Sequence, residues 1–148
     1  MTEIMPSASI LIVDDSITYR SAVRIALENE KAIAIGGSVR DGAKAIEFIN
    51  IRIREGKRNL AKGVGTAEAF RELPQLLTLD IEMPVMDGLQ VLDEMQRINQ
   101  ELKEINPEIP SIFAIVLSSH TVEGAKITLK ALNKGAIDFI SKPVGKSQ

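Results

Sequence analysis

The 148-residue sequence has no cysteine, no tryptophan, one tyrosine and one histidine. Without cysteine the chain can form neither a disulfide nor a thiolate zinc site, which fits a reducing compartment. The formal net charge of −2 gives no field that would attract nucleic acid or an anionic membrane surface. No apolar stretch approaches the length of a membrane span, and residues 1–9 lack the basic and apolar regions of a secretion signal. We therefore expect a soluble, cytoplasmic protein that folds as a single domain over residues 1–148.

The sequence alternates short apolar runs with amphipathic stretches. The apolar runs predict strands at residues 10–13, 32–39, 76–79, 112–117 and 136–140. The stretches between them predict helices at about residues 16–30, from 42 onward, from 88 onward and at 122–133. Ser16 is the expected N-cap of the first helix, and Gly135 is the expected C′ residue of the last. Strands that alternate with helices in this way indicate an α/β fold with a parallel sheet covered on both faces.

Apolar residues at helical spacing predict which side of each helix faces the core. The expected inward residues are Tyr19, Ala22, Val23, Ala26 and Leu27; Ile46, Ile49 and Ile53; Val91, Leu92, Met95, Ile98 and Leu102; and Ala125, Leu129 and Leu132.

Ionisable or hydroxyl side chains follow four of the predicted strands where each strand ends. These residues are Asp14, Asp15, Asp80, Ser118, Ser119 and Lys142. Right-handed crossovers bring all β-to-α junctions to one edge of a parallel sheet, where open α/β sheets bind their ligands. Each residue taken singly has an ordinary interpretation as a cap, a loop serine or a solvated lysine. Their recurrence at four strand ends favours a shared site.

The chemistry of this set of residues points to phosphoryl transfer. Neighbouring carboxylates repel one another and remain ionised together only around a cation, and such oxygen ligands suit Mg²⁺. An ammonium group such as that of Lys142 and a hydroxyl such as that of Ser118 suit phosphoryl oxygens. Because the set contains no histidine or cysteine, the expected covalent phosphoryl acceptor is a carboxylate, and the central Asp80 is our choice.

With these residues in view, the chain resembles the receiver domain of two-component response regulators. Within that family it is most similar to the receiver of the chemotaxis protein-glutamate methylesterase. The motifs are Asp14-Asp15, Thr78-Leu79-Asp80-Ile81-Glu82-Met83-Pro84, Leu117-Ser118-Ser119 with Gly124, and residues 135–143. The resemblance covers residues 8–54 and 75–145, and it implies a flavodoxin-like doubly wound sheet of strand order 2-1-3-4-5.

The resemblance also implies a role for each residue of the site. Asp80 would take a phosphoryl group from a histidine kinase, a phosphotransfer protein or a small phosphodonor. Mg²⁺ would be held by Asp15, Asp80 and the main-chain carbonyl of Glu82, with Asp14 assisting through water. Ser118 and Lys142 would bind the phosphoryl oxygens, Phe139 would change rotamer as Ser118 moves inward, and Pro143 would follow a cis peptide bond.

Two features at the end of the chain depart from the family. The catalytic esterase domain of the methylesterase is not apparent, so we expect a regulatory domain rather than an enzyme. The sequence after Lys142 is too short for the usual fifth helix, so we expect the fold to lack it. Either the chain is a fragment of a longer protein, or another chain covers that part of the sheet, and an uncovered apolar face favours an oligomer or a fragment.

The connection at about residues 54–75, between the second helix and the third strand, is longer than the family needs. It contains Lys57, Arg58 and Lys62, and the segment 66–73 could be helical with Thr66 as its cap. Long insertions are functional or disordered. A docking patch is one interpretation, and a solvated extension of the second helix is the simpler one. Without aromatic residues for base stacking, we expect no direct nucleic-acid binding.

His120 lies two positions after Ser118, and Glu82 lies two positions after Asp80. Both positions belong to the rim of the predicted site, where family members vary the lifetime of the phosphoryl group. We hypothesise that Glu82 and His120 control hydrolysis by positioning or excluding water. The alternative for His120 is an ordinary solvent-exposed loop histidine.

Three classes of function remain open from the sequence. The favoured one is a phosphorylatable signalling switch that acts on a downstream protein target or on its own association. The second is a pseudo-receiver that only mediates protein contacts. The third is an aspartate-nucleophile phosphatase, for which Asp80-Ile81-Glu82 is a poor match.

Overall fold

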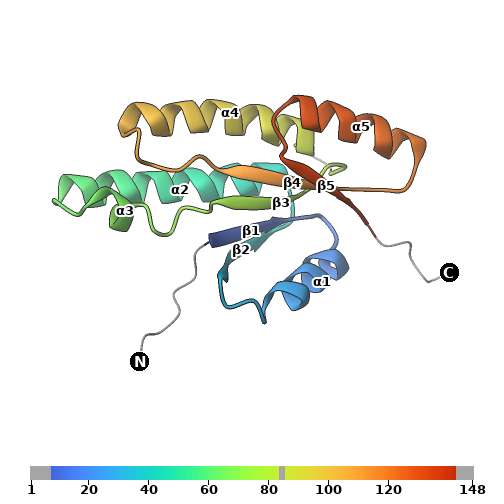
Figure 1. The fold of residues 1–148 in the computed structure, drawn as a ribbon, viewed down its shortest axis with the longest axis horizontal. Helices are drawn as coiled ribbons and strands as arrows, with labels where there is room; N and C mark the ends of the chain where they lie inside the picture. Colours follow the sequence, from blue (N-terminus) through green and yellow to red (C-terminus); the bar gives the residue numbers. More distant parts are fainter. Residues whose placement is uncertain (1–7, 84–85, 143–148) are drawn as a thin grey trace.

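The computed structural model describes residues 8–83 and 86–142 as a five-stranded sheet flanked by helices. The strand order is β2-β1-β3-β4-β5, and all neighbouring strands are parallel. The elements are β1 (Ala8–Val13), α1 (Ile17–Leu27), β2 (Ile33–Val39), α2 (Gly42–Ala61), α3 (Thr66–Ala69), β3 (Leu76–Asp80), α4 (Gly88–Ile105), β4 (Phe113–Ser118), α5 (Val122–Asn133) and β5 (Asp138–Ser141). Figure 1 shows α2, α4 and α5 on one face of the sheet and α1 on the other. The predicted flavodoxin-like doubly wound fold is therefore confirmed.

The main core lies between helices α2 and α4 and the face of the sheet that they cover. The strands contribute apolar residues of which Leu11, Val13, Leu77, Leu79 and Val116 are fully buried. The expected inward residues of α2 and α4 are all buried: Ile46, Ile49, Ile53, Val91, Leu92, Met95, Ile98 and Leu102. These residues pack on the central strands, two of which, β1 and β3, lead to the acidic residues at their carboxyl ends.

The predicted inward faces of α1 and α5 are partly wrong. Of the expected residues of α1, Tyr19, Val23 and Leu27 are half-buried, while Ala22 and Ala26 are exposed, because α1 packs mainly against β1 and β2 at one side of the sheet. In α5 the sheet side consists of Gly124, Thr128 and Ala131, and Leu129 is 64% exposed.

The Thr128 hydroxyl can face the sheet because it donates a hydrogen bond to the carbonyl of Gly124, 2.7 Å away. A threonine satisfied by its own helix carries no penalty for an unpaired polar group, so it can take a core position. A pattern of apolar residues alone misses this. Ala125, expected to face inward, is instead exposed, and Leu132 is half-buried against the core.

Capping residues fix most helix ends, and one of the expected caps is wrong. Ser16 caps α1 by accepting a hydrogen bond from the Tyr19 N–H at 3.3 Å, as predicted. Asp87 and Gln90 form a capping box at the start of α4. Gly135 follows α5 with φ of +111°, the left-handed conformation expected of a C′ glycine. Thr66, however, is the first residue of α3 rather than its cap, and its hydroxyl accepts a hydrogen bond from Asn106 instead.

Gly88, the first residue of α4, allows that helix to begin directly against the end of β3. A Cβ atom at this position would lie 2.7 Å from the Cα of Ile81 and 3.0 Å from the carbonyl oxygen of Asp80. No side chain fits at such distances without moving the backbone. The Asp87-Gly88 pair thus caps the helix and keeps its first turn close to Asp80.

The insertion is ordered, and its first part is a continuation of α2 to Ala61. Beyond the turn at Gly63, the residues Ala69, Phe70 and Leu73 are buried and join the main core. Phe70 packs on Gly56, where an added Cβ would lie 2.2 Å from the aromatic ring. The predicted boundary at residue 54 therefore falls inside a helix, because the apolar spacing of α2 ends before its hydrogen bonding does.

Basic residues of the insertion pair with carboxylates. Arg52 lies 3.1 Å from Glu55, and Lys57 lies 3.5 Å from Glu101 of α4. A third pair joins Arg71 and Glu68 at 3.3 Å. The partner of Lys57 comes from another helix, so the sequence of the insertion alone does not show it. This pairing favours the simpler interpretation of the insertion as an extension of the fold.

β5 is the last element among the described residues 8–83 and 86–142. All four of its residues are exposed, with Phe139 at 46% and Ile140 at 53%. The expected lack of a helix after β5 concerns residues 143–148, which lie outside the described residues. Pro143, the expected cis-proline, lies outside the described residues. Among the described residues, no helix has the length and apolarity needed to cross a membrane.

Candidate functional site

The carboxyl ends of β1, β3 and β4 and the residue after β5 meet at one edge of the sheet. The structure places Asp14, Asp80, Ser118 and Lys142 there, each at or directly after its strand. Carboxylate oxygens of Asp14, Asp15 and Asp80 all lie within 4.8 Å of one another. The parallel register brings together residues that are far apart in the sequence, as the strand-end pattern predicted.

Asp14 is fully buried and accepts hydrogen bonds from two residues that follow it closely in the sequence. Its Oδ1 accepts a hydrogen bond from the Ser16 N–H at 2.9 Å. Its main-chain carbonyl accepts a hydrogen bond from the Arg20 guanidinium at 2.7 Å. The neighbouring Asp15 is exposed, so it presents its carboxylate from the solvent side of the cluster.

Asp80 is 2% exposed and is the last residue of β3. Its Oδ1 accepts a hydrogen bond from the Glu82 N–H at 3.1 Å. Burial, followed by the charge of Asp14 and a hydrogen bond with Asp15, raises the pKa of Asp80 to about 7, although the Glu82 N–H and Lys142 oppose the shift. The fold therefore holds this carboxylate where its ionised form is disfavoured unless a cation is near.

Lys142 supplies a cation between the two buried carboxylates. Its Nζ lies 3.2 Å from Oδ2 of Asp14 and 3.2 Å from Oδ2 of Asp80. Burial lowers the pKa of Lys142, but the charges of Asp80 and Asp14 outweigh it and leave the pKa raised. The ammonium group is therefore charged at neutral pH.

The donor set suits a divalent cation. Within the described residues, Oδ2 of Asp14 and Oδ2 of Asp80 are buried, accept no hydrogen bond of good geometry and share the single ammonium group of Lys142. One ammonium group leaves part of the negative charge of two buried carboxylates uncompensated, and a hard cation with oxygen ligands removes that cost. Asp14, Asp15 and Asp80 can therefore hold a metal ion.

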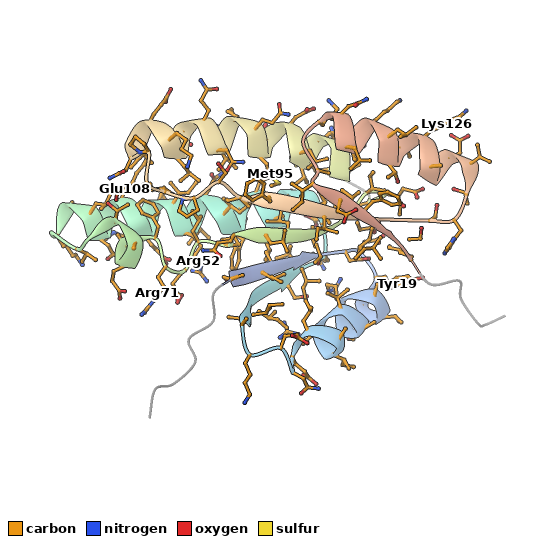
Figure 2. The ribbon with its side chains drawn as sticks, viewed as in Figure 1. Tyr19, Arg52, Arg71, Met95, Glu108 and Lys126 are labelled. Carbon is orange, nitrogen blue, oxygen red and sulfur yellow. The ribbon has the colours of Figure 1, made fainter. Side chains whose placement is uncertain are left out.

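The aromatic ring of Tyr19 and the guanidinium of Arg20 are parts of the site that the sequence analysis did not identify. The Nζ of Lys142 lies 4.4 Å from the centre of the Tyr19 ring, a cation–π contact. Figure 2 shows Tyr19 at the start of α1, beside the end of β5. The available signal was position, since Tyr19 and Arg20 lie in the first turn after Asp14 and Asp15. The helical spacing assigned Tyr19 to the core instead.

The other predicted residues lie around this centre. Ser118 is 4% exposed, and its carbonyl accepts a hydrogen bond from the Lys142 N–H at 2.7 Å. The Ser119 hydroxyl bonds with that of Thr121 at 2.8 Å rather than with the acidic cluster. Glu82 and His120 have exposed side chains. Phe139 lies beside Val116 of β4 and is 46% exposed, so its ring points partly into solvent.

The chain matches the family model of the response regulator receiver domain over residues 10–148. Curated relatives include the protein-glutamate methylesterase/protein-glutamine glutaminase of Desulfotalea psychrophila, 35% identical over 97% of this chain and 31% of that protein. A protein of the same name from Methanospirillum hungatei is 36% identical over 92% of this chain and 31% of its own length. The chain thus spans about a third of these relatives.

Solved structures of receiver domains are also similar to this chain. The response regulator domain of Thermotoga maritima CheB is 30% identical, with a TM-score of 0.59, over 95% of this chain and 82% of that domain. The signal receiver domain of NarL from Mycobacterium tuberculosis has a TM-score of 0.66 over 95% of this chain and 87% of that domain, and at 23% identity it supports the fold alone.

Proposed function

Because the chain belongs to the response regulator receiver domain family, we propose that it is a phosphoacceptor switch of a two-component phosphorelay, phosphorylated on Asp80. The observation that carries the proposal is the buried Asp80 carboxylate, which faces Asp14 and the Lys142 ammonium at the carboxyl edge of the sheet. Such a site provides a nucleophile and cationic groups for a transferred phosphoryl group.

We assign Mg²⁺ to the acidic cluster, with Asp14, Asp15, Asp80 and the main-chain carbonyl of Glu82 as the groups that would hold it. The cation would neutralise charge on the transferred phosphoryl group. The buried Oδ2 atoms of Asp14 and Asp80, which share one lysine ammonium group for two negative charges, support this assignment.

In the transfer step, a carboxylate oxygen of Asp80 forms a bond to phosphorus, and the bond between phosphorus and the donor's leaving group breaks. The leaving group takes up a proton from solvent or from an acidic group of the donor. The donor would be the phosphohistidine of a histidine kinase or phosphotransfer protein, or a small phosphodonor. Lys142 neutralises the phosphoryl oxygens, and the Ser118 hydroxyl donates a hydrogen bond to one of them.

The response to phosphorylation would involve Ser118 and Phe139. Movement of the buried Ser118 toward the phosphoryl group leaves space that the half-exposed Phe139 ring can enter. The change in the exposed surface of β5 would then alter binding to a downstream protein target or to a second copy of the chain. In this role the chain acts as a cytoplasmic regulatory domain, and its only chemistry is its own phosphorylation and dephosphorylation.

The test is the intact mass of the protein after incubation with a small phosphodonor, with and without Mg²⁺. We expect one added phosphoryl group that requires Mg²⁺ and is lost in Asp80→Asn. An adduct that persists in Asp80→Asn would contradict the assignment of the acceptor. Absence of any adduct at saturating Mg²⁺, even on rapid quenching, would favour the pseudo-receiver alternative, and turnover of a phosphoester substrate would favour the phosphatase.

A further inference from the structure

The contact between Lys142 and Tyr19 gives the ammonium group a partner that carries no formal charge. The Lys142 side chain is 16% exposed, and among the described residues its Nζ has three neighbours from separate parts of the chain. Two of them, Asp14 and Asp80, are carboxylates that would also hold a metal ion. The third is the face of the Tyr19 ring, 4.4 Å away.

These three partners respond differently when the acidic cluster binds a cation. A divalent ion at Asp14 and Asp80 neutralises their charge and repels the ammonium group of Lys142. The quadrupole of an aromatic ring does not change when the carboxylates are neutralised, so it continues to attract the ammonium group. Tyr19 is therefore the partner that keeps its attraction in the state that reacts.

Tyr19 is itself fixed in position by its surroundings. It lies in the first turn of α1, where its N–H donates a hydrogen bond to the Ser16 hydroxyl. The next residue, Arg20, donates a hydrogen bond to the carbonyl of Asp14, which ties the same turn to the end of β1. The ring thus stands in a fixed relation to the acidic cluster.

We propose that Tyr19 is a positioning residue for phosphoryl transfer, whose ring holds the Lys142 ammonium at the acceptor carboxylate when the acidic cluster is occupied by a cation. This inference rests on the proposed function. In this role Tyr19 acts through Lys142 and not on the reacting atoms. Its effect is on the rate of transfer and not on binding of the cation.

The kinetic test compares the rate of phosphorylation by a small phosphodonor, at saturating Mg²⁺, in Tyr19→Phe and Tyr19→Leu. The phenylalanine variant keeps the ring and should stay within about twofold of the wild type, whereas loss of the ring should slow the reaction about fivefold to tenfold. Affinity for Mg²⁺ should be unchanged or tighter in both variants. A weaker affinity in Tyr19→Leu, or equal rates in the two variants, would overturn the proposal.

A double-mutant comparison separates positioning from a general structural effect. In a Lys142→Met background, Tyr19→Leu should cause no further loss of rate, because the partner of the ring is already gone. A further loss as large as in the wild type would show that Tyr19 acts by another route. Phe113→Leu is the matched control, since it removes an exposed aromatic ring at the opposite end of β4.

The contact can also be tested without phosphorylation. Tyr19 is the only tyrosine of the chain and there is no tryptophan, so intrinsic tyrosine fluorescence reports this ring alone. Acrylamide should quench the emission more strongly in Lys142→Met than in the wild type, with Lys134→Met as the control. Equal quenching would overturn the proposed contact. If the contact is found but the wild type accepts no phosphoryl group, the proposed function fails while the packing of Tyr19 on Lys142 stands.

Discussion

Asp14 and Asp80 point their buried Oδ2 atoms at one shared cation, the ammonium group of Lys142, which lies 3.2 Å from each. One positive charge for two buried carboxylates leaves the cluster with excess negative charge. Burial and repulsion by Asp14 are the two largest causes of the raised pKa of Asp80, about 7. The site is therefore under electrostatic strain when no other cation is present.

Replacing Asp80 by Asn should stabilise the protein in chelator at pH 8. The substitution removes one of the repelling charges and keeps the size of the side chain. We expect the free energy of unfolding to rise by about 1–3 kcal/mol in urea denaturation. Asp41→Asn, which removes a carboxylate outside the cluster, is the control and should leave the stability nearly unchanged, because asparagine caps a helix about as well as aspartate. A lower melting temperature for Asp80→Asn would contradict the repulsion.

Stability in chelator should also depend on pH through Asp80. Its pKa is raised from 3.8 to about 7 on folding, so between these values the folded state binds a proton that the unfolded state has lost. The free energy of unfolding therefore falls as pH rises through this window and levels off above about pH 7. Other carboxylates titrate at the acidic end of this window. The measurement is therefore the difference in the free energy of unfolding between wild type and Asp80→Asn, taken at about pH 5.5 and at about pH 8.

This pH dependence should disappear when the cluster is filled. Saturating Mg²⁺ favours the ionised form of Asp80, so the difference between wild type and Asp80→Asn should become smaller or reverse at pH 8. If the same gap persists with Mg²⁺ and with chelator, the acidic cluster does not bind the ion.

His120→Ala and Glu82→Ala should change the lifetime of the phosphoryl group. Both residues are exposed and the Glu82 N–H bonds to Asp80, and the prediction rests on the hypothesis that the two positions border the path of an attacking water. We expect a change of about threefold or more in the rate of decay of the phosphorylated protein, measured by mass after removal of the phosphodonor. His120 is an ordinary surface residue if its variant decays at the wild-type rate.

Thr78→Val should stabilise the protein by about 1 kcal/mol. Thr78 lies in β3 between Ile12 and Ile115 and is 9% exposed, and its hydroxyl is buried with no hydrogen-bond partner among the described residues. Valine has nearly the same shape without the polar atom. Thermal denaturation of Thr78→Val beside Thr78→Ser decides the matter, because the serine variant keeps the hydroxyl and loses a methyl group. If valine destabilises as much as serine, the hydroxyl has a partner.

Gly56→Ala should separate the insertion from the core. Its new Cβ would meet the Phe70 ring at 2.2 Å, so the ring must leave its buried position, at a cost of about 1–3 kcal/mol. Gly65→Ala is the matched control, because nothing lies within 4 Å of its added Cβ. Phosphorylation of both variants should proceed at the wild-type rate, since the insertion joins the strands at the edge opposite Asp80. A loss of activity in folded Gly56→Ala would show that the two edges are coupled.

The position of the acidic cluster could be predicted because it follows from local patterns, whereas the strand order was implied by the resemblance to receiver domains. An apolar run that ends in Asp14-Asp15 or in Asp80 indicates both a strand and its carboxyl end. Parallel strands then bring these carboxyl ends together at one edge of the sheet. The buried faces of α2 and α4 were predictable because these helices lie over the centre of the sheet. Their apolar stripes are wide and leave one orientation.

Other features depend on contacts between distant residues and have no local signal. Lys57 forms an ion pair with Glu101 on another helix, and the Phe70 ring, which follows the turn after α2, packs on Gly56. Thr128 faces the sheet because its hydroxyl is satisfied inside its own helix. Tyr19 looked like a core residue because helical spacing shows the side of the helix and not what lies there, which in this case is the ammonium of Lys142.

The lengthened α2 shows where this architecture can grow. Every connection from a helix to the next strand runs at the edge away from Asp80, and the extra turns of α2 and the whole of α3 lie on that side. Residues can be added there in evolution, or grafted there in the laboratory, without changing the spacing of the strand ends that assemble the acidic cluster. One edge of the molecule is thus under strict geometric constraint, and the other is free to vary.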